Sequence, residues 1–110
     1  MRIRKDTDDL QEEEITLVAQ VSDALAHPAR IRIYQYIMKC NKERIPVCNK
    51  DVVSAFDYSQ ATISQHIKKL CQSGLVQMQK NEKCSMYYAN IGVLMKYLDA
   101  TRKFSTFDAR

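Results

Sequence analysis

The sequence predicts a mainly helical domain with one small β-hairpin, the winged helix-turn-helix architecture. Only 2 Gly and 2 Pro occur among 110 residues, so few and short loops are expected. Two short segments with helical spacing are separated by a tight turn at Asp57 and Tyr58. After Gly74 the hydrophobic period changes from 3.6 residues to 2, which indicates a hairpin. The expected order is helix, helix, short strand, helix, helix, strand, strand, helix.

The first two helices are predicted from their start signals. A helix is expected over residues 10–25, with Asp9 as its N-cap. Three consecutive glutamates in its first turn suit the positive end of the helix dipole. The second helix is expected to begin at Pro28, because a proline at the first helical position gives up no hydrogen bond. His27 is its expected cap.

The middle of the chain is predicted from Pro46, which cannot lie in a helix interior. The RIPV stretch that contains it is therefore expected to be extended, as a short edge strand. A short helix is expected over 49–56. Ser59 then caps a helix over 60–72, and Gly74 ends that helix in the left-handed conformation.

The last third of the chain is predicted as a hairpin and a final helix. The strands are LVQMQK and SMYYAN, at 75–80 and 85–90, and the helix covers 91–104. No glycine lies at the hairpin tip, so Asn81 is expected to adopt the left-handed conformation there.

One domain is expected over residues 10–104, between a loose segment at 1–9 and a tail at 105–110. The net charge of +4 is unevenly distributed, because residues 1–14 carry −3 and residues 15–110 carry +7. A basic body is compatible with a polyanion partner. An ordinary solvated surface would show the same excess of charge.

The helix over 60–72 has two contrasting faces. Ile63, Ile67 and Leu70 form an apolar stripe that is expected to pack into the core. The helix contains no acidic residue, whereas an ordinary amphipathic surface helix normally mixes both signs. Amides and hydroxyls on its other face suit base edges, and the lysines suit phosphates. The candidate DNA-binding residues here are Ser59, Gln60, Ala61, Thr62, Ser64, Gln65, His66, Lys68 and Lys69.

The predicted hairpin adds two further candidates. Lys80 and Lys83 lie near its tip, with Glu82 between them. A wing of this kind can contact the DNA backbone or the minor groove. The alternative is a hairpin that merely covers the core.

Three stretches of the sequence resemble the ArsR/SmtB family of winged-helix regulators. SDALAHPARIRIYQYI is similar to that family's entry into the second helix. YSQATISQHIKKLCQSGLV resembles its recognition helix, and QMQKNEKCSMYYAN its wing. The resemblance covers about residues 15–104. It implies a homodimeric repressor that binds a palindromic operator in double-stranded DNA and is released by an inducer, whose identity the sequence does not reveal.

The resemblance also implies that the flanking helices, 10–25 and 91–104, pack across a two-fold axis. Two copies of helix 60–72 would then lie about one DNA turn apart. The same apolar residues would serve equally well as the core of a monomer. The expected dimer-interface residues are Ile15, Val18, Val21, Ile91, Leu94, Met95 and Leu98.

The sequence departs from the metal-binding pattern of the family that it resembles. Many members bind metal through two thiols one residue apart near the third helix, but here Pro46 replaces the first and only Cys48 remains. Other members use His and carboxylates on the last helix, which here offers Asp99 and no His. One soft ligand cannot fill a zinc or arsenite site. We therefore expect no metal site of the family type and no cofactor.

The four cysteines show no CxxC pairing, so free thiols are expected in a reducing cytoplasm. Cys48 lies near Lys50 at a predicted helix N-terminus, where the helix dipole lowers a thiol pKa. One alternative is a thiol switch, formed by Cys48 with Cys40 or by a bond between subunits. A response to a soft metal through Cys48 belongs to the same alternative. The other is that Cys40, Cys48 and Cys71 are small buried hydrophobic residues, with Cys84 exposed.

The sequence lacks the motifs of an enzyme. It has no Gly-rich phosphate loop, no recognisable Ser or Cys triad and no HExxH motif. No apolar run approaches the roughly 20 residues of a membrane span, and no signal peptide is visible, so a cytoplasmic location is expected. A non-enzymatic DNA-binding regulator is predicted. The alternative class is a winged-helix protein-interaction module, which usually loses the polar, acid-free face that this chain keeps.

Overall fold

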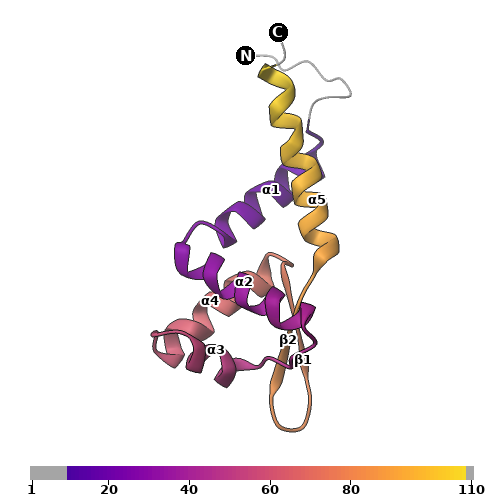
Figure 1. Cartoon of the computed structure of the whole chain (residues 1–110). Coiled ribbons are helices and arrows are strands. Elements are labelled where there is room, and N and C mark those ends of the chain that lie inside the picture. Colours follow the sequence, from indigo (N-terminus) through magenta and orange to yellow (C-terminus); the bar gives the residue numbers. More distant parts are fainter. Residues whose placement is uncertain (1–9, 109–110) are drawn as a thin grey trace.

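The computed structural model describes residues 10–108, which form five α-helices, two β-strands and one 3₁₀ helix (Figure 1). The expected order of the helices and of the hairpin strands is confirmed. The elements are α1 Glu12–Ala24, α2 Pro28–Lys42, α3 Asn49–Ala55, α4 Gln60–Gln72, β1 Val76–Lys80, β2 Ser85–Ala89, α5 Ile91–Arg102 and η1 Lys103–Asp108.

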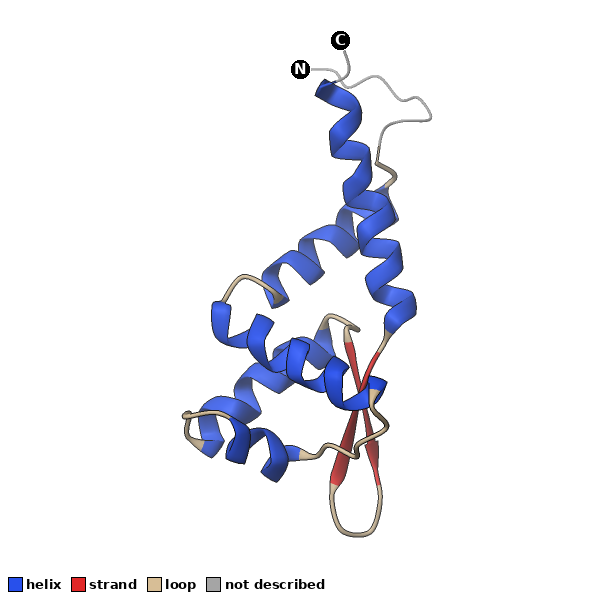
Figure 2. Cartoon of the chain, in the orientation of Figure 1, coloured by secondary structure: helices blue, strands red, loops and turns tan. Residues whose placement is uncertain are grey.

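The helices and the hairpin divide into a body and a projecting pair. Helices α2, α3 and α4 gather around the start of the hairpin, and the hairpin loop extends past them (Figure 2). Helix α1 packs against α5, which extends away from this body (Figure 1). None of the helices within residues 10–108 combines the length and apolarity needed to cross a membrane.

The core lies where α2, α4 and the root of the hairpin meet. Helix α1 reaches it with Val21 and Ala24, near its C-terminal end. Burying large aliphatic side chains is the main stabilising contribution to a domain of this size. The largest fully buried side chains are Val21, Ile33, Ile37, Val47, Val52, Ile63, Leu70, Leu75 and Val76.

The extended segment before α3 forms less sheet than expected. It makes one bridge, between Cys48 and Met86, and the Tyr87 N–H donates to the Val47 carbonyl at 3.0 Å. The side chain of Asn41 takes the adjoining places on β2. Its amide donates to the Tyr87 carbonyl at 3.2 Å, and its oxygen accepts from the Ala89 N–H at 2.7 Å. The predicted edge strand is therefore reduced to a single bridge. The Asn41 side chain makes the hydrogen bonds to the β2 backbone that a longer strand would have made.

The hairpin pairs Val76 with Ala89 and Lys80 with Ser85 in antiparallel register. At its tip, the expectation of a left-handed Asn81 is wrong, since Arg44 (φ 60°) is the non-glycine residue with positive φ in the described part of the chain. The side-chain oxygen of Asn81 instead accepts the N–H groups of the third and second residues after it, Cys84 and Lys83, both at 2.9 Å. This Asx-type turn replaces the missing glycine.

The helix ends agree with the expected signals in part. Ser59 caps α4 and Gly74 follows it with φ +87°, both as predicted. His27 occupies the N-cap position of α2, but its side chain makes no capping hydrogen bond. The N-cap of α1 is Gln11, whose N–H donates to the carboxylate of the residue three positions later at 2.9 Å; Asp9 lies outside the described residues.

The end of the domain also differs from the prediction. Helix α5 ends at Arg102, and a 3₁₀ helix over Lys103–Asp108 continues into the expected tail at 105–110. The expected loose segment at 1–9 lies outside the described residues.

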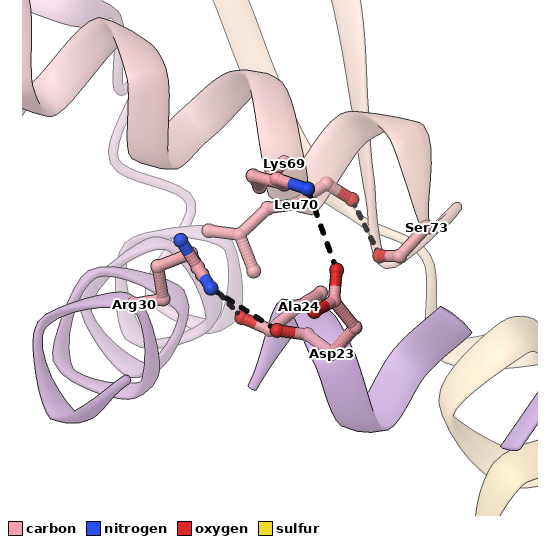
Figure 3. A network of polar contacts seen from close by, with 6 residues as sticks. All are labelled: Asp23, Ala24, Arg30, Lys69, Leu70 and Ser73. Carbon is pink, nitrogen blue, oxygen red and sulfur yellow. Dashed lines mark hydrogen bonds and ion pairs between the residues drawn. The ribbon is translucent and has the colours of Figure 1, made fainter. Parts of the chain in front are cut away.

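A polar network fastens the end of α1 to α2 and α4 (Figure 3). The guanidinium of Arg30, which is 7% exposed, donates to the carbonyls of Ala24 at 2.7 Å and Asp23 at 3.1 Å. Carbonyls in the last turn of a helix have no partner within the helix; the Asp23 carbonyl also accepts the Ala26 N–H at 3.2 Å. A cation also suits the negative end of the helix dipole. The Asp23 carboxylate also pairs with Lys69 of α4 at 3.4 Å. Helix α4 is thereby tied to the first two helices.

Candidate nucleic-acid interface

Helix α4 carries the strongest candidate surface. Ile63, Ile67 and Leu70 are buried beneath it, which confirms the predicted inward stripe. No aspartate or glutamate interrupts its sequence. The exposed residues on its outer side are Gln60, Ala61, Ser64, Gln65, Lys68 and Lys69. The surface thus offers amide, hydroxyl and ammonium groups without a competing carboxylate on the helix.

The first turn of α4 is held by its cap. The Ser59 hydroxyl accepts the Thr62 N–H at 3.2 Å and donates to the Thr62 hydroxyl at 3.0 Å. Thr62 is half-buried, and its hydroxyl is already used within the cap. Gln60 and Ala61, between the two, remain exposed. The cap therefore fixes the start of the helix and leaves the side chains of these two residues exposed.

Asn49, which sequence reasoning did not single out, joins three elements at this surface. It begins α3, and its amide donates to the Ser64 hydroxyl of α4 at 3.4 Å and to the Tyr87 hydroxyl of β2 at 3.5 Å. The residue therefore links α4 to β2. No periodicity or motif identifies it, because the link depends on three segments meeting in space.

The lysines of the surface differ in how far their charge is compensated. No carboxylate in the described part of the chain lies within ion-pair distance of Lys68, Lys80 or Lys83, and all three are exposed. Lys69 instead pairs with Asp23. On this surface, therefore, the lysines without an ion pair lie in the middle of α4 and near the hairpin tip.

His66 is placed differently from the other candidates on α4. Its ring lies 6.4 Å from that of His27 and 6.3 Å from that of Tyr58, measured between centroids, and its Nδ1 is buried without a hydrogen-bond partner. Burial lowers the pKa of His66 below its ordinary value of 6.5, and the nearby charges of Arg30 and His27 act in the same direction. A half-buried neutral imidazole is better suited to packing than to contacting phosphate.

The residues expected at the dimer interface fall into three groups. Ile91, Met95 and Leu98 of α5 are 51%, 47% and 42% exposed, and Ile15 of α1 is also exposed. Val18 and Leu94 are half-buried. Val21 is fully buried in the core, so its prediction as an interface residue is wrong: the end of α1 turns inward toward the body.

The cysteines correct two further expectations. Cys40 and Cys48 are buried, whereas Cys71 and Cys84 are half-buried, so Cys84 is more covered than predicted. Cys48 is the N-cap of α3, and its thiol donates to the Asp51 carboxylate at 3.2 Å.

The pKa of Cys48 is raised, not lowered as the helix dipole alone predicts. Burial is the main cause, followed by the hydrogen bond to Asp51 and then by the thiol of Cys84. The pKa of the Asp51 carboxyl is itself lowered by the N–H and the thiol of Cys48. Its negative charge therefore disfavours a thiolate beside it. Among the other thiols, that of Cys84 contributes to the raised pKa of Cys48.

Comparison with known proteins identifies relatives of this chain. A family model described as a helix-turn-helix domain matches residues 25–79, half of the chain. The arsenical resistance operon repressor of Staphylococcus xylosus is 31% identical over 73 residues. This match covers 66% of the chain and 65% of that relative, so the matched region spans just under two thirds of the relative's length.

Solved structures share the fold. An ArsR-like transcriptional regulator from Rhodococcus sp. RHA1 superposes with a TM-score of 0.73 at 20% identity, over 86% of this chain and 84% of that one. The homodimeric winged helix-turn-helix DNA-binding domain of a possible ArsR-family regulator from Mycobacterium bovis gives 0.65 at 19% identity, over 92% and 87%. With the matching helix-turn-helix model and the observed hairpin after α4, the chain belongs to the ArsR/SmtB family of winged helix-turn-helix transcriptional regulators.

Proposed function

We propose that the chain is a homodimeric repressor that reads an operator in double-stranded DNA through α4 and contacts the flanking backbone through its wing. The observation that carries the proposal is the exposed, acid-free face of α4, beside which the wing places two further uncompensated lysines. In this proposal the protein acts in the cytoplasm as a regulator and catalyses no reaction.

The proposed division of labour follows from the chemistry of the side chains. Gln60, Ser64 and Gln65 are exposed hydrogen-bonding groups that suit base edges in the major groove. Lys68 and the wing lysines Lys80 and Lys83 suit phosphates, which fix the register without reading the sequence. Ser59 and Thr62 orient the helix start, Lys69 contributes a partly compensated charge, and Ala61 suits a thymine methyl. His66 is assigned to packing.

The proposed dimer uses the exposed apolar side of α5. Ile91, Met95 and Leu98 recur at helical spacing, and together with Ile15 they would be covered by a second copy. The relative from Mycobacterium bovis is described as homodimeric. A two-fold axis between the α5 helices would present two copies of α4 to successive turns of the same face of DNA.

The proposal is tested by titrating the protein into a fluorescent 30-base-pair duplex at several salt concentrations, with anisotropy as the readout. Each phosphate contact that a lysine neutralises should steepen the plot of log affinity against log salt by about 0.9. Binding that weakens steeply between low and moderate salt is the expected result. An affinity that stays flat would contradict the proposed role of the lysines, and absence of binding would contradict the function itself.

A further inference from the structure

A groove lies between α2 and the start of α5. Its walls also include Phe56, which follows α3, and Ala89 at the end of β2. The groove has a volume of about 1100 Å³, somewhat above the roughly 300–1,000 Å³ of typical small-molecule sites. The described residues that line it include none from α4. Apart from Ile91, the function proposed above uses none of them, so the groove has no role in it.

One part of the lining is apolar and aromatic. The rings of Tyr36 and Phe56 meet edge to face, with centroids 5.6 Å apart and planes at 82°. Both residues are half-buried, as is Met38, so part of each side chain remains accessible. Ile91, which is 51% exposed, adds aliphatic surface at the start of α5. Small-molecule sites are lined mainly by side chains of this kind, and their accessible surface favours an apolar partner.

The other part of the lining is basic. Arg32, Lys39 and Lys42 of α2 are exposed, and the described residues around the groove include no aspartate or glutamate. None of the three bases lies within ion-pair distance of a carboxylate in the described part of the chain. The dipole of α2 favours lysines in its last turn, but it does not account for Arg32, which lies in the N-terminal half of the helix. The three charges are therefore available to an anionic group of a ligand.

We propose that this groove binds a small organic anion, with an apolar body of aromatic size and one acidic group. The body lies against the Tyr36–Phe56 pair, where ring contacts contribute beyond the burial of area. The acidic group faces the bases of α2, among which a guanidinium offers paired N–H donors to an oxyanion. Charge complementarity favours an anion over a neutral ligand, because the lining carries three cations and no carboxylate.

The site borders the proposed dimer interface without depending on it. Ile91 belongs both to the groove and to the exposed stripe of α5. The two rings and the three bases all come from one chain, on α2 or directly after α3. One ligand per chain is therefore expected, whether the protein is monomeric or dimeric.

Ring contacts connect the groove to α4. Phe56 stacks on Tyr58 with centroids 6.1 Å apart and planes at 13°, and Tyr58 meets His66 of α4 edge-on at 6.3 Å. A ligand seated on Phe56 therefore touches a row of rings that runs through the turn between α3 and α4. Its effect on DNA binding rests on the proposed function. Coupling between two binding sites is reciprocal, so ligand and DNA would change each other's affinity by the same factor.

The test uses two fluorescent probes with the same rings, anilinonaphthalenesulfonate and the neutral phenylnaphthylamine, each titrated with the full chain. The double variant Arg32→Gln/Lys39→Gln removes two charges at exposed positions. Each exposed ion pair contributes a factor of roughly 1.5 to 5. The anionic probe should therefore bind about 2- to 25-fold more weakly, and the neutral probe as before. Lys50→Gln/Lys96→Gln, at two exposed lysines outside the groove, is the charge-matched control and should change neither affinity.

The apolar part of the site is tested with Phe56→Leu. Loss of the ring should weaken the binding of both probes roughly 2- to 10-fold, since aromatic contacts contribute beyond the burial of area. Phe104→Leu, at a ring that is 50% exposed and outside the groove, is the matched control. Circular dichroism checks that both variants are folded.

Two results would overturn the site: unchanged affinity of Arg32→Gln/Lys39→Gln for the anionic probe, and an equal loss in its charge-matched control. DNA binding is measured separately by anisotropy, with and without the anionic probe. A DNA affinity that the bound probe leaves unchanged would contradict the coupling through Phe56. Charge-dependent probe binding by a chain that does not bind DNA would refute the regulator and keep the groove, and the reverse would refute the groove alone.

Discussion

The body of the molecule and helix α5 use their apolar residues in opposite ways. Apart from Val21, all the largest fully buried side chains lie between Ile33 and Val76, within the body. Helix α5 contributes Ala100 as its buried residue, while three of its large apolar side chains are among the most exposed in the described chain. The body therefore buries its large apolar side chains within one chain. Helix α5 leaves three of its own exposed.

This difference indicates what each region is for. A closed core holds α4 at a fixed angle to the wing, which is what reading a groove requires. An exposed apolar stripe on a helix is stabilised when a second surface covers it, at about 25 cal/mol per Å² of apolar area removed from water. Recognition is thus assigned to the body, and pairing of two bodies to α5.

The largest effect is expected from breaking the α5 stripe with Leu98→Glu. A carboxylate buried without a partner at a dimer interface costs several kcal/mol. Because each 1.4 kcal/mol is a factor of ten, operator affinity should fall by roughly 100-fold or more. Sedimentation and anisotropy measure the two losses, and circular dichroism should show the body still folded.

The control for that variant is Lys96→Gln, an exposed position on the same helix that changes the net charge by the same amount. It should stay dimeric and bind normally. A parent that is already monomeric at tens of micromolar, or a Leu98→Glu protein that remains dimeric with full affinity, would contradict the role given to α5.

A smaller effect is expected from Gln65→Ala on the reading face of α4. A good bidentate base contact contributes about 1–3 kcal/mol of discrimination, so affinity for the operator should fall roughly 5- to 150-fold while affinity for random DNA changes little. Gln72→Ala, an exposed amide at the other end of α4, is the matched control. Equal losses on the operator and on random DNA would assign Gln65 to the backbone instead.

A still smaller and sequence-independent effect is expected at the wing. Lys80→Gln and Lys83→Gln should each reduce the slope of log affinity against log salt by about 0.9 if the lysine contacts a phosphate. The loss should be the same on operator and random DNA. Lys96→Gln, on the projecting helix, should leave the slope unchanged; a slope that is also unchanged in both wing variants would show that the hairpin only covers the core.

The smallest effect concerns stability and pH at His66. Because the folded protein holds the pKa of His66 below 6.5, the unfolded chain takes up a proton before the folded one does. The contribution of His66 to stability is therefore complete above pH 6.5 and decreases as the pH falls below it. Urea unfolding between pH 7.5 and 5.5 should show a weaker decrease for His66→Gln than for the parent. Identical pH dependence in the two proteins would place the imidazole in solvent.

Most of the fold could be predicted because its signals are local. Ser59 and Gly74 bound α4 at the predicted residues, since a cap hydroxyl and a left-handed glycine act within one turn of chain. The edge strand before α3 was predicted longer than it is. Asn41, more than 40 residues from β2 in the sequence, occupies its place, and no pattern of hydrophobicity encodes such a substitution.

For the candidate site, the sequence predicts the composition of the surface and not the contacts of its residues. The acid-free face of α4 is visible in the sequence, but the partners of its residues are not. Asn49 reaches Ser64, and Asp23 reaches Lys69, across more than a dozen residues of chain. Val21 has the spacing of an interface residue yet lies in the core, because periodicity gives the apolar side of a helix and not the surface that covers it.

The central claim is that two copies of α4, held by paired α5 helices, read one duplex together. The most direct test is to select bound fragments from a random pool of duplex DNA and sequence them. The account predicts an inverted repeat whose half-site centres lie about 10–10.5 base pairs, or a multiple of that, apart. A single unrepeated half-site, or a pool without any enriched sequence, would contradict it.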